Sequence, residues 1–537
     1  MRRRILNLRT PGAGKGHCGG EAGSPDPCGG RPDHDRGGRG GLNGRPGGWK
    51  GDVGPNGARP QRLLRRYRMG ALLAGLCLLA AACSGSAKSA ELPERPHIVV
   101  FLADDLGWSD VGYHQSEIDT PTIDALAADG VRLEALYASP TCSPTRAALM
   151  TGRYPMRYGL QSGVLRPHSN YGLPLEERTL ADLLREAGYE TAICGKWHLG
   201  FFEPAYRPTQ RGFDHQYGCY NGAIDYLAKT RFGGVDWHRD DQPLISMTEM
   251  GGVERAESEV GYVTDLIARE AVRVIEGRDT ERPLFLYVPF TAPHAPLQAP
   301  AEEIERLEGI EDINRRAYAA MVHRLDARIA TVLGALEASG MRENTLVVFA
   351  SDNGGDPLFG GSNVPLSGGK RELGEGGLRV PGIVSWPGVL EARSVNEPIS
   401  FVDWLPTFAA LAGVDLAGGP ALDGVDLAPV LTGGTLEREE LLLHLEPDRA
   451  ALRSGAWKLV RHGTFDQEPT NLQLFDVVYD PSETNDKAAE RTDVVRRMSE
   501  ALDAFAAQAA PARGWPNDPP PENYRPPAVW GQGQDED

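Results

Sequence analysis

The sequence contains no apolar run long enough to span a bilayer, and it contains few cysteines. Its longest apolar run, residues 69–82, is shorter than the roughly 20 residues that a transmembrane helix requires, which excludes a polytopic membrane protein. Only 7 of the 537 residues are cysteines, and four of these lie within the first 83 residues. A disulfide framework is therefore excluded for the body of the chain. The other three cannot all pair with one another, so at least one of them is free: Cys142, Cys194 and Cys219.

Positive charge is scarce beyond residue 68. The first 68 residues contain 15 Lys and Arg against 5 Asp and Glu, which leaves 41 against 69 for the rest of the chain, a net charge of −28. Binding to nucleic acid depends on Lys and Arg that neutralise phosphates, so we expect no nucleic-acid partner. An anionic substrate would have to be captured by a local cluster of positive charge.

The two ends of the chain differ in composition from the body. Residues 1–68 are rich in Gly, Arg and Pro without apolar periodicity, which indicates a disordered segment or one that precedes the true start of translation. Residues 69–83 follow four arginines and end in AAAC, which is typical of a signal peptide with a lipobox-like end, and residues 84–95 form a linker. We therefore expect an exported protein, periplasmic or on the cell surface, with a lipid attached to Cys83. Residues 511–537 are Pro-rich and acidic and are predicted to form an extended tail.

From residue 95 onward, short β-branched runs alternate with helical patterns. Residues 97–105 (HIVVFLADD), 283–290 (PLFLYVPF) and 345–353 (TLVVFASDN) each predict a buried strand. Residues 315–340 carry apolar side chains at helical spacing, which indicates a core helix. This alternation is typical of an α/β protein, with a mostly parallel sheet and helices on both of its faces.

Two of the predicted strands end in side chains that carry oxygen. Asp104 and Asp105 end the first strand, and Asp352 and Asn353 end the last. Ligands collect beyond the carboxyl ends of the strands in open α/β sheets. An all-oxygen set suits Ca²⁺ or Mg²⁺ better than zinc or copper. Either pair alone is better explained as a helix cap or a turn, so the metal site depends on the motifs that accompany the pairs.

Residues 140–152 (PTCSPTRAALMTG) contain the most informative motif, in which Cys142 begins a C-x-P-x-R pattern. Residues 188–200 (GYETAICGKWHLG) contain a second candidate motif. Together with the two strand-end pairs in the same order, these segments resemble the type I sulfatases, in which the motif cysteine is oxidised to formylglycine after translation. The resemblance covers nearly all of residues 95–500 and is greatest to the arylsulfatase B subgroup, the N-acetylgalactosamine-4-sulfatases.

The resemblance also implies a fold. Sulfatases have an alkaline-phosphatase-like α/β fold, in which helices flank a large mixed sheet and a small α+β subdomain follows at the C-terminus. The catalytic domain is predicted to span residues 96–437, and the subdomain residues 438–510. Within the subdomain we expect strands at 451–460 and 474–480 and a closing helix at 494–507.

The nucleophile implied by the resemblance is formylglycine at position 142. A serine that attacked a sulfate ester would itself become a sulfate ester, and it would stay blocked until water attacked the sulfur. The hydrated aldehyde carries two hydroxyls, so one can attack sulfur while the other, once deprotonated, expels sulfate and regenerates the aldehyde. An unmodified Cys142 should be inactive in this mechanism.

The remaining site residues are implied by their positions in the matching segments. Arg146 lies one helical turn after the nucleophile and would steady the diol. Lys196 and Lys370 would hold the sulfuryl group, His198 would take a proton from the second hydroxyl, and His294 would act near the leaving oxygen. The predicted catalytic residues are Cys142, Arg146, Lys196, His198, His294 and Lys370. The predicted ligands of Ca²⁺ or Mg²⁺ are Asp104, Asp105, the modified Cys142, Asp352 and Asn353.

We therefore expect a sulfuric ester hydrolase that acts on sulfated carbohydrates or aryl sulfates and that requires a formylglycine-generating enzyme for its maturation. Two other functions stay open: a formylglycine-dependent phosphonate monoester hydrolase or phosphodiesterase of the same superfamily, and an inactive glycan-binding lipoprotein. Seven residues of the segment 201–250 could line a sugar pocket: Tyr206, Arg207, Tyr220, Asp225, Tyr226, Trp237 and His238. Three histidines are assigned to surface or supporting positions: His114, His168 and His215.

Overall fold

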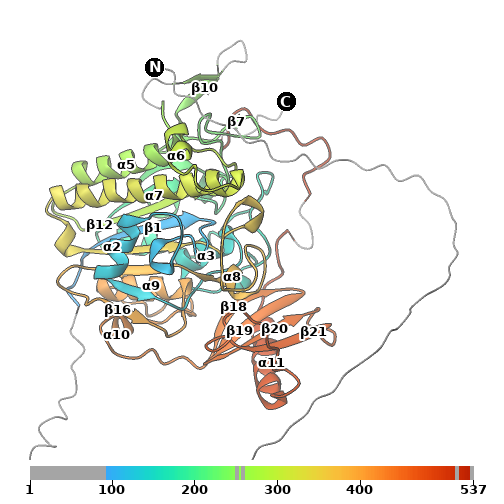
Figure 1. The fold of residues 1–537 in the computed structure, drawn as a ribbon. Helices are drawn as coiled ribbons and strands as arrows, with labels where there is room; N and C mark the ends of the chain where they lie inside the picture. Colours follow the sequence, from blue (N-terminus) through green and yellow to red (C-terminus); the bar gives the residue numbers. More distant parts are fainter. Residues whose placement is uncertain (1–91, 248–252, 256–259, 515–518, 532–537) are drawn as a thin grey trace, which may run out of the picture. The chain divides into compact units, whose positions relative to one another are not determined.

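The structure is a computed structural model that describes residues 92–247, 253–255, 260–514 and 519–531 (Figure 1). The predicted N-terminal segment and signal peptide lie outside the described residues, as do residues 84–91 of the predicted linker. Within the described residues, no helix is long and apolar enough to cross a membrane. The three cysteines of the described body are all free and buried.

A ten-stranded mixed sheet forms the centre of the fold (Figure 1). Five neighbouring strands run parallel, in the order β13-β1-β12-β4-β5, and antiparallel pairing begins on both sides of them. The predicted mixed sheet is therefore confirmed, and three of its strands coincide with the predicted ones. The strands in spatial order are β16 (Arg393–Val395), β2 (Val131–Leu133), β15 (Gly382–Ser385), β13 (Thr345–Ser351), β1 (His97–Asp104), β12 (Leu284–Pro293), β4 (Glu190–Lys196), β5 (His215–Cys219), β8 (His238–Arg239) and β9 (Gln242–Pro243).

Both faces of the sheet are buried, which explains why β1 is apolar along nearly its whole length. The odd-numbered residues from Val99 to Ala103 pack in a core with α2, α5 and α7. The even-numbered residues from Ile98 to Leu102 pack in a second core with α3, α4 and α9. Figure 1 shows α5 and α7 on one side of the sheet and α9 on the other. The helices are α2 (Pro121–Asp129), α3 (Cys142–Thr151), α4 (Leu180–Glu186), α5 (Val263–Gly277), α6 (Ala301–Arg306), α7 (Ile313–Ala338), α8 (Glu375–Leu378), α9 (Trp404–Leu411) and α10 (Ala428–Leu431).

Three small sheets accompany the large one. They are the three-stranded sheet β14 (Arg379–Val380), β3 (Leu136–Tyr137) and β17 (Ile399–Ser400), and two hairpins, β6 (Thr230–Arg231) with β7 (Gly234–Val235) and β10 (Ile245–Met247) with β11 (Val253–Arg255).

The C-terminal subdomain is a four-stranded antiparallel sheet followed by the helix α11 (Thr492–Ala506). Its strands are β18 (Leu441–Glu446), β19 (Arg449–Ser454), β20 (Trp457–His462) and β21 (Asn471–Asp476). The predicted helix is present, but the single strand predicted at 451–460 is wrong. Gly455 adopts a φ of 59°, and the chain reverses there, so the segment forms a hairpin of two strands. The strand predicted at 474–480 lies a few residues earlier.

The C-terminal tail returns to the body of the fold. Val529 forms a parallel bridge with Val235 of β7, and the side chain of Trp530 is only 2% exposed. The predicted extended tail is therefore anchored at a buried aromatic residue. Its neighbours include Pro520 and Tyr524, which border the cavity described below.

Candidate active site

The carboxyl ends of three parallel strands meet at one edge of the sheet. β1 and β13 pair in register from His97 and Thr345 to Ala103 and Ser351, so the residues that follow the two strands come to lie together. On its other side, β1 pairs with β12 as far as Pro293, which brings His294 to the same edge. Ligand atoms of four residues lie within 4.8 Å of one another: Asp104, Asp105, Cys142 and His294.

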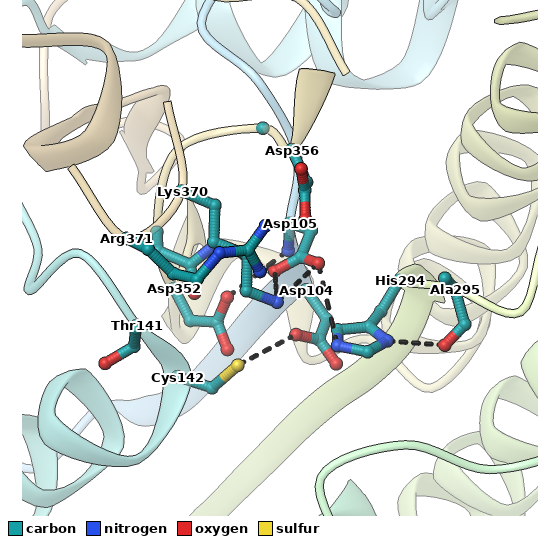
Figure 2. A network of polar contacts seen from close by, with 12 residues as sticks. Asp104, Asp105, Thr141, Cys142, His294, Ala295, Asp352, Asp356, Lys370 and Arg371 are labelled. Atoms are coloured by element: carbon teal, nitrogen blue, oxygen red, sulfur yellow. Dashed lines mark hydrogen bonds and ion pairs between the residues drawn. The ribbon is translucent and has the colours of Figure 1, made fainter. Parts of the chain in front are cut away.

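Cys142 is the first residue of α3, and it points at the strand ends (Figure 2). Its Sγ lies 3.5 Å from Asp104 Oδ1. The helix begins after Thr141 and tolerates Pro144 in its first turn, where the missing backbone N–H has no intrahelical acceptor. It ends at Gly152, whose φ of 66° gives a left-handed C-cap. Burial raises the pKa of the Cys142 thiol to about 12.

Each predicted metal-binding carboxylate has a cationic partner. Lys196 Nζ lies 2.6 Å from Asp104, and the lysine is completely buried. The other two carboxylates are paired in the same way: Lys370 Nζ with Asp105 at 2.6 Å, and Arg146 Nη2 with Asp352 at 2.7 Å. Arg146 also donates through Nη1 to the carbonyl oxygen of Lys196, at 2.9 Å. The cations therefore fix the positions of the carboxylates at the base of the site.

Burial and charge act differently on the two aspartates of β1. Burial raises the pKa of Asp104 to about 7, because desolvation outweighs the attraction of Lys196. Burial also raises the pKa of Asp105, but the charge of Lys370 and the hydrogen bonds from Lys370 and Asn353 outweigh burial and hold the pKa of Asp105 below its usual value. A further cation beside Asp104 would keep both carboxylates ionised.

Asn353 provides a direct test of whether these residues fit a metal ion. Its Nδ2 donates to Asp105 Oδ1 at 2.8 Å and to the Gly354 carbonyl at 2.9 Å. Its Oδ1 is buried, and no described residue donates a hydrogen bond to it. A buried oxygen without a donor is costly, and a cation next to the carboxylates would satisfy it. The set of oxygen ligands therefore fits Ca²⁺ or Mg²⁺.

The two histidines are neutral in this environment. Burial, together with the nearby Lys196 and Arg146, lowers the pKa of His198. His198 Nε2 lies 3.0 Å from the Leu165 carbonyl oxygen, while its buried Nδ1 has no partner among the described residues. Burial, together with Lys370, lowers the pKa of His294 to about 3, and its Nδ1 lies 2.6 Å from the Ala295 carbonyl oxygen.

A cavity of about 740 Å³ opens over the predicted nucleophile, and four of the predicted catalytic residues line it: Cys142, His198, His294 and Lys370. A second cavity of about 480 Å³ shares His294 and Lys370 with the first. Arg146 and Lys196, by contrast, are completely buried behind the carboxylates. The structure thus brings all the predicted site residues to one place, but only some of them face the cavity.

Most of the residues predicted to line a sugar pocket border neither cavity. Asp225 borders the smaller cavity. Four others are buried in the fold: Tyr220, Tyr226, Trp237 and His238. His168, assigned by sequence to a surface or supporting position, lines the larger cavity instead.

Several residues of the cavity wall were missed by sequence reasoning. Arg449 comes from the C-terminal subdomain, Tyr524 comes from the tail, and Gly222 follows β5. A Cβ at Gly222 would lie 2.3 Å from His198 Cε1, so only glycine permits this approach. The sequence contains no local signal for these residues, because their role depends on contacts between distant segments.

Residues 96–414 match the sulfatase family. The chain belongs to this family. The sulfatase is 34% identical over 486 residues to arylsulfatase J of Mus musculus, a match that covers 81% of this chain and 80% of that protein. It is 34% identical over 401 residues to N-acetylgalactosamine-6-sulfatase of Canis lupus familiaris, covering 71% of this chain and 74% of that protein. The solved structure of Ps i-CgsB in complex with k-i-k-neocarrahexaose has a TM-score of 0.70 and 32% identity, and the match covers 78% of this chain and 94% of that chain.

These matches confirm the predicted family, the alkaline-phosphatase-like fold and the enzyme class of a sulfatase that hydrolyses sulfate esters. They do not address the subgroup, the nucleophile, the cation or the roles of individual residues, which stay predictions.

Proposed function

We propose that this sulfatase removes sulfate groups from sulfated glycans and that its nucleophile is formylglycine formed from Cys142. The observation that carries the proposal is the position of Cys142, which is buried beside the carboxylates and lines the cavity. Burial raises the pKa of its thiol to about 12, so an unmodified cysteine would hold its proton at neutral pH and would be a poor nucleophile. An aldehyde hydrate at the same position avoids this difficulty.

We assign a Ca²⁺ or Mg²⁺ ion to the oxygen atoms of Asp104, Asp105, Asp352 and Asn353, together with the modified Cys142. When bound, the cation would lower the pKa of the diol and draw charge from the sulfuryl oxygens. The buried Asn353 Oδ1 without a donor supports this assignment.

The other residues bind, orient and exchange protons. Lys370 lines the cavity and offers a positive charge to the sulfuryl group, while Arg146 and Lys196 fix the carboxylates from behind. His198 is neutral, and its Nδ1 has no described partner, so it can accept a proton from the second hydroxyl. An anionic sulfate beside His294 raises the pKa of that imidazole, which favours donation of a proton to the leaving oxygen.

The glycan substrate is supported by the size of the cavity and by the relatives. A cavity of about 740 Å³ is large enough for a sugar with its sulfate. One relative is named N-acetylgalactosamine-6-sulfatase, and one solved neighbour holds a neocarrahexaose. The specific version of the proposal is removal of the sulfate from a terminal galactosamine-type sugar, with 4-sulfation as the first choice and 6-sulfation as the comparison.

We also propose that the protein is exported and carries a lipid on Cys83, because the arginines, the apolar run and AAAC precede that residue in order. Metabolic labelling with a fatty acid should mark the wild-type protein, and Cys83→Ala should abolish the label. An unlabelled wild-type protein in a host with lipoprotein-processing enzymes would contradict this proposal.

Mass spectrometry of the peptide that contains residue 142 tests the nucleophile. Protein made together with a formylglycine-generating enzyme should carry an aldehyde in place of the thiol, and it should hydrolyse an aryl sulfate faster than an aryl phosphonate or a phosphodiester. An active preparation with an intact thiol would overturn the mechanism. Faster phosphonate turnover would assign the alternative hydrolase function.

Elemental analysis of the same preparation tests the cation. Wild-type protein should hold about one Ca²⁺ or Mg²⁺ ion per chain, and Asn353→Ala should lower that content. Asn485→Ala, a change of the same kind at an exposed position of the subdomain, is the matched control. Unchanged metal content in Asn353→Ala would remove Asn353 from the ligand set.

A further inference from the structure

The wall of the larger cavity is rich in arginine. Beyond the catalytic residues, it is formed by residues 162–171, the hairpin of β6 and β7, the C-terminal subdomain and the tail. Glu446 is the single carboxylate among the described residues of this lining. Four arginines face it: Arg166, Arg231, Arg371 and Arg449.

Two of these arginines form ion pairs with carboxylates of the described residues, and two do not. Arg449 Nε lies 2.7 Å from Glu446 Oε2, and Arg371 Nη2 lies 2.6 Å from Asp356 Oδ2. The guanidinium groups of Arg166 and Arg231 form no ion pair or hydrogen bond with any described residue. Their charge therefore remains available to a ligand in the cavity.

Arg231 is held in place without a direct ion pair to any described residue. Its Cζ lies 4.2 Å from the centre of the Phe232 ring, and its Nε is buried without a described partner. Burial lowers the pKa of Arg231, Asp236 opposes this change, and the positive charge of Arg166 adds to it. Both side chains line the same cavity, so an anion there meets two positive charges, of which that of Arg231 is partly balanced by Asp236.

The tail holds the hairpin that carries Arg231. Trp530 Nε1 donates to the Arg231 carbonyl oxygen at 2.9 Å, and the backbone N–H of Trp530 donates to the Val235 carbonyl oxygen at 2.9 Å. The N–H of Val235 donates to the carbonyl oxygen of Ala528 at 2.8 Å. A Cβ at Gly234 would lie 2.2 Å from the Pro527 carbonyl oxygen, so the tail and the hairpin are in direct contact.

Aromatic side chains lie on the same wall. The rings of Tyr524 and His168 make an edge contact, with centroids 5.6 Å apart, and both residues line the cavity with Tyr171. Aromatic rings next to cations suit a sugar that carries an acidic group, because the rings cover the apolar face of the sugar while guanidinium groups bind the anion.

We propose that Arg166 and Arg231 form a second anion-binding subsite, which takes a sulfate or carboxylate group on a sugar adjacent to the one that is desulfated. The proposal rests on the proposed glycan sulfatase function and extends it: the preferred substrate is an oligosaccharide with more than one negative charge. The planar guanidinium groups bind either anion through paired hydrogen bonds, so both sources share one chemistry.

The test compares oligosaccharides that carry the same scissile sulfate. The adjacent sugar is neutral in the first, O-sulfated in the second and a uronic acid in the third, and a small aryl sulfate serves as the reference. The wild-type enzyme should show kcat/KM values about 10- to 100-fold higher for a charged neighbour than for the neutral one, the effect of one charge-assisted hydrogen-bonded contact. The ratio of the second to the third substrate identifies which anion the subsite prefers.

Arg166→Gln and Arg231→Gln should each remove most of this preference through KM while leaving kcat/KM for the aryl sulfate within about twofold. Arg496→Gln, which makes the same change of charge on the exposed side of α11, should leave every substrate unaffected. Equal rates of the wild type on neutral and charged oligosaccharides would overturn the subsite, and so would an unchanged preference in both variants. A wild type that fails on the aryl sulfate and on all three oligosaccharides would instead contradict the proposed function.

Discussion

At the scale of single residues, the site is organised as buried ion pairs. Each pair places one cation against one carboxylate at 2.6–2.7 Å, and none of the six side chains is exposed. Removing one member of such a pair leaves a buried charge without compensation, which costs far more than the pair itself contributes. The pairs are Asp104 with Lys196, Asp105 with Lys370 and Asp352 with Arg146.

Lys196→Ala should therefore destabilise the whole protein as well as abolish turnover. In protein freed of metal by a chelator, Asp104 would stay buried without its partner, so the free energy of unfolding should fall by about 3–5 kcal/mol. Denaturant unfolding followed by fluorescence measures this loss. Lys487→Ala removes a lysine from an exposed pair with Glu490 and should cost under about 1 kcal/mol. Equal losses in the two variants would show that the buried pair with Asp104 contributes no more to the free energy of unfolding than an exposed pair does.

The sequence predicted these residues because their signals are local. Asp104 and Asp352 each follow an apolar run, and Cys142 and Arg146 share one motif. The exposure of the residues was not predictable in the same way. Lys196 was expected to hold the sulfuryl group, whereas the structure places it at the base of the site against Asp104, since burial depends on the packing of all the neighbouring strands.

At the scale of secondary-structure elements, turns after the strands aim the catalytic side chains. His198 follows β4 with a φ of 59°, and Asp105 follows β1 with a φ of 67°. Non-glycine residues rarely adopt these left-handed conformations, and they persist where the surrounding structure imposes them. In this sulfatase the neighbouring strand contributes, because Gly222 after β5 leaves room for the ring of His198.

Gly222→Ala should displace the ring of His198 and lower kcat. The added Cβ would lie 2.3 Å from Cε1, which requires the imidazole to move. Loss of alignment by about 1 Å costs on the order of 100-fold in rate, so kcat for an aryl sulfate should fall by about that factor. Gly277→Ala is the matched control, because nothing lies within 4 Å of its Cβ position near the end of α5. Full activity in Gly222→Ala would show that the close approach has no catalytic role.

His215 joins three elements and should make stability depend on pH. It lies on β5, its Nδ1 is 2.9 Å from Asp240 after β8, and its Nε2 is 2.9 Å from Glu270 on α5. Burial alone would lower its pKa, but hydrogen bonds and attraction from the two carboxylates raise the pKa to about 9. A pKa raised in the folded state stabilises most fully below the unfolded value of about 6.5, and this contribution disappears as the pH rises through about 9.

The free energy of unfolding should therefore decrease between pH 6.5 and pH 9, and His215→Gln should flatten that decrease. Denaturant unfolding at a series of pH values measures the slope. His462→Gln, on β20 and outside this cluster, is the control. The same slope in wild type and His215→Gln would contradict the assignment of this pH dependence to His215.

The elements themselves were predictable where a long apolar pattern defined them. β1, β13 and α7 correspond to such patterns, and their bounds differ from the predicted ones by about two residues. The hairpin of β19 and β20 was missed because Gly455 interrupts an otherwise continuous strand pattern. A glycine in a strand pattern is compatible with a bulge as well as a turn, and only the pairing of residues on its two sides decides between them.

At the scale of the whole molecule, the net charge of the chain and the charge of the cavity lining have opposite signs. The chain beyond residue 68 has a net charge of −28, which repels an anionic glycan at long range. The cavity has the opposite character, with arginines from segments far apart in the sequence. The contact between Trp530 and Arg231 joins residues 299 positions apart, and no local pattern of a Pro-rich tail predicts such a contact.

This long-range contact leads to a prediction about how the tail acts. Trp530→Ala should release the hairpin of Arg231 from the tail, since it removes a side chain that is 2% exposed and packs against Phe201. We expect KM for a charged oligosaccharide to rise by about tenfold or more, with a much smaller change for an aryl sulfate, because the nucleophile and the carboxylates lie on other elements. Steady-state kinetics on both substrates measures the difference, and limited proteolysis should cut the variant faster within the tail.

Two further substitutions separate loss of the anchor from loss of general stability. Trp530→Phe retains an aromatic ring but lacks the donor to the Arg231 carbonyl oxygen, so its KM for the charged oligosaccharide should lie between those of the wild type and Trp530→Ala. Trp457→Ala removes a tryptophan from β20, away from the cavity, and should leave the ratio of the two KM values unchanged. If Trp530→Ala impaired both substrates to the same extent, the tail would act on the stability of the whole fold. Selective loss of the charged oligosaccharide would instead establish that residues 519–531 help to determine the substrate.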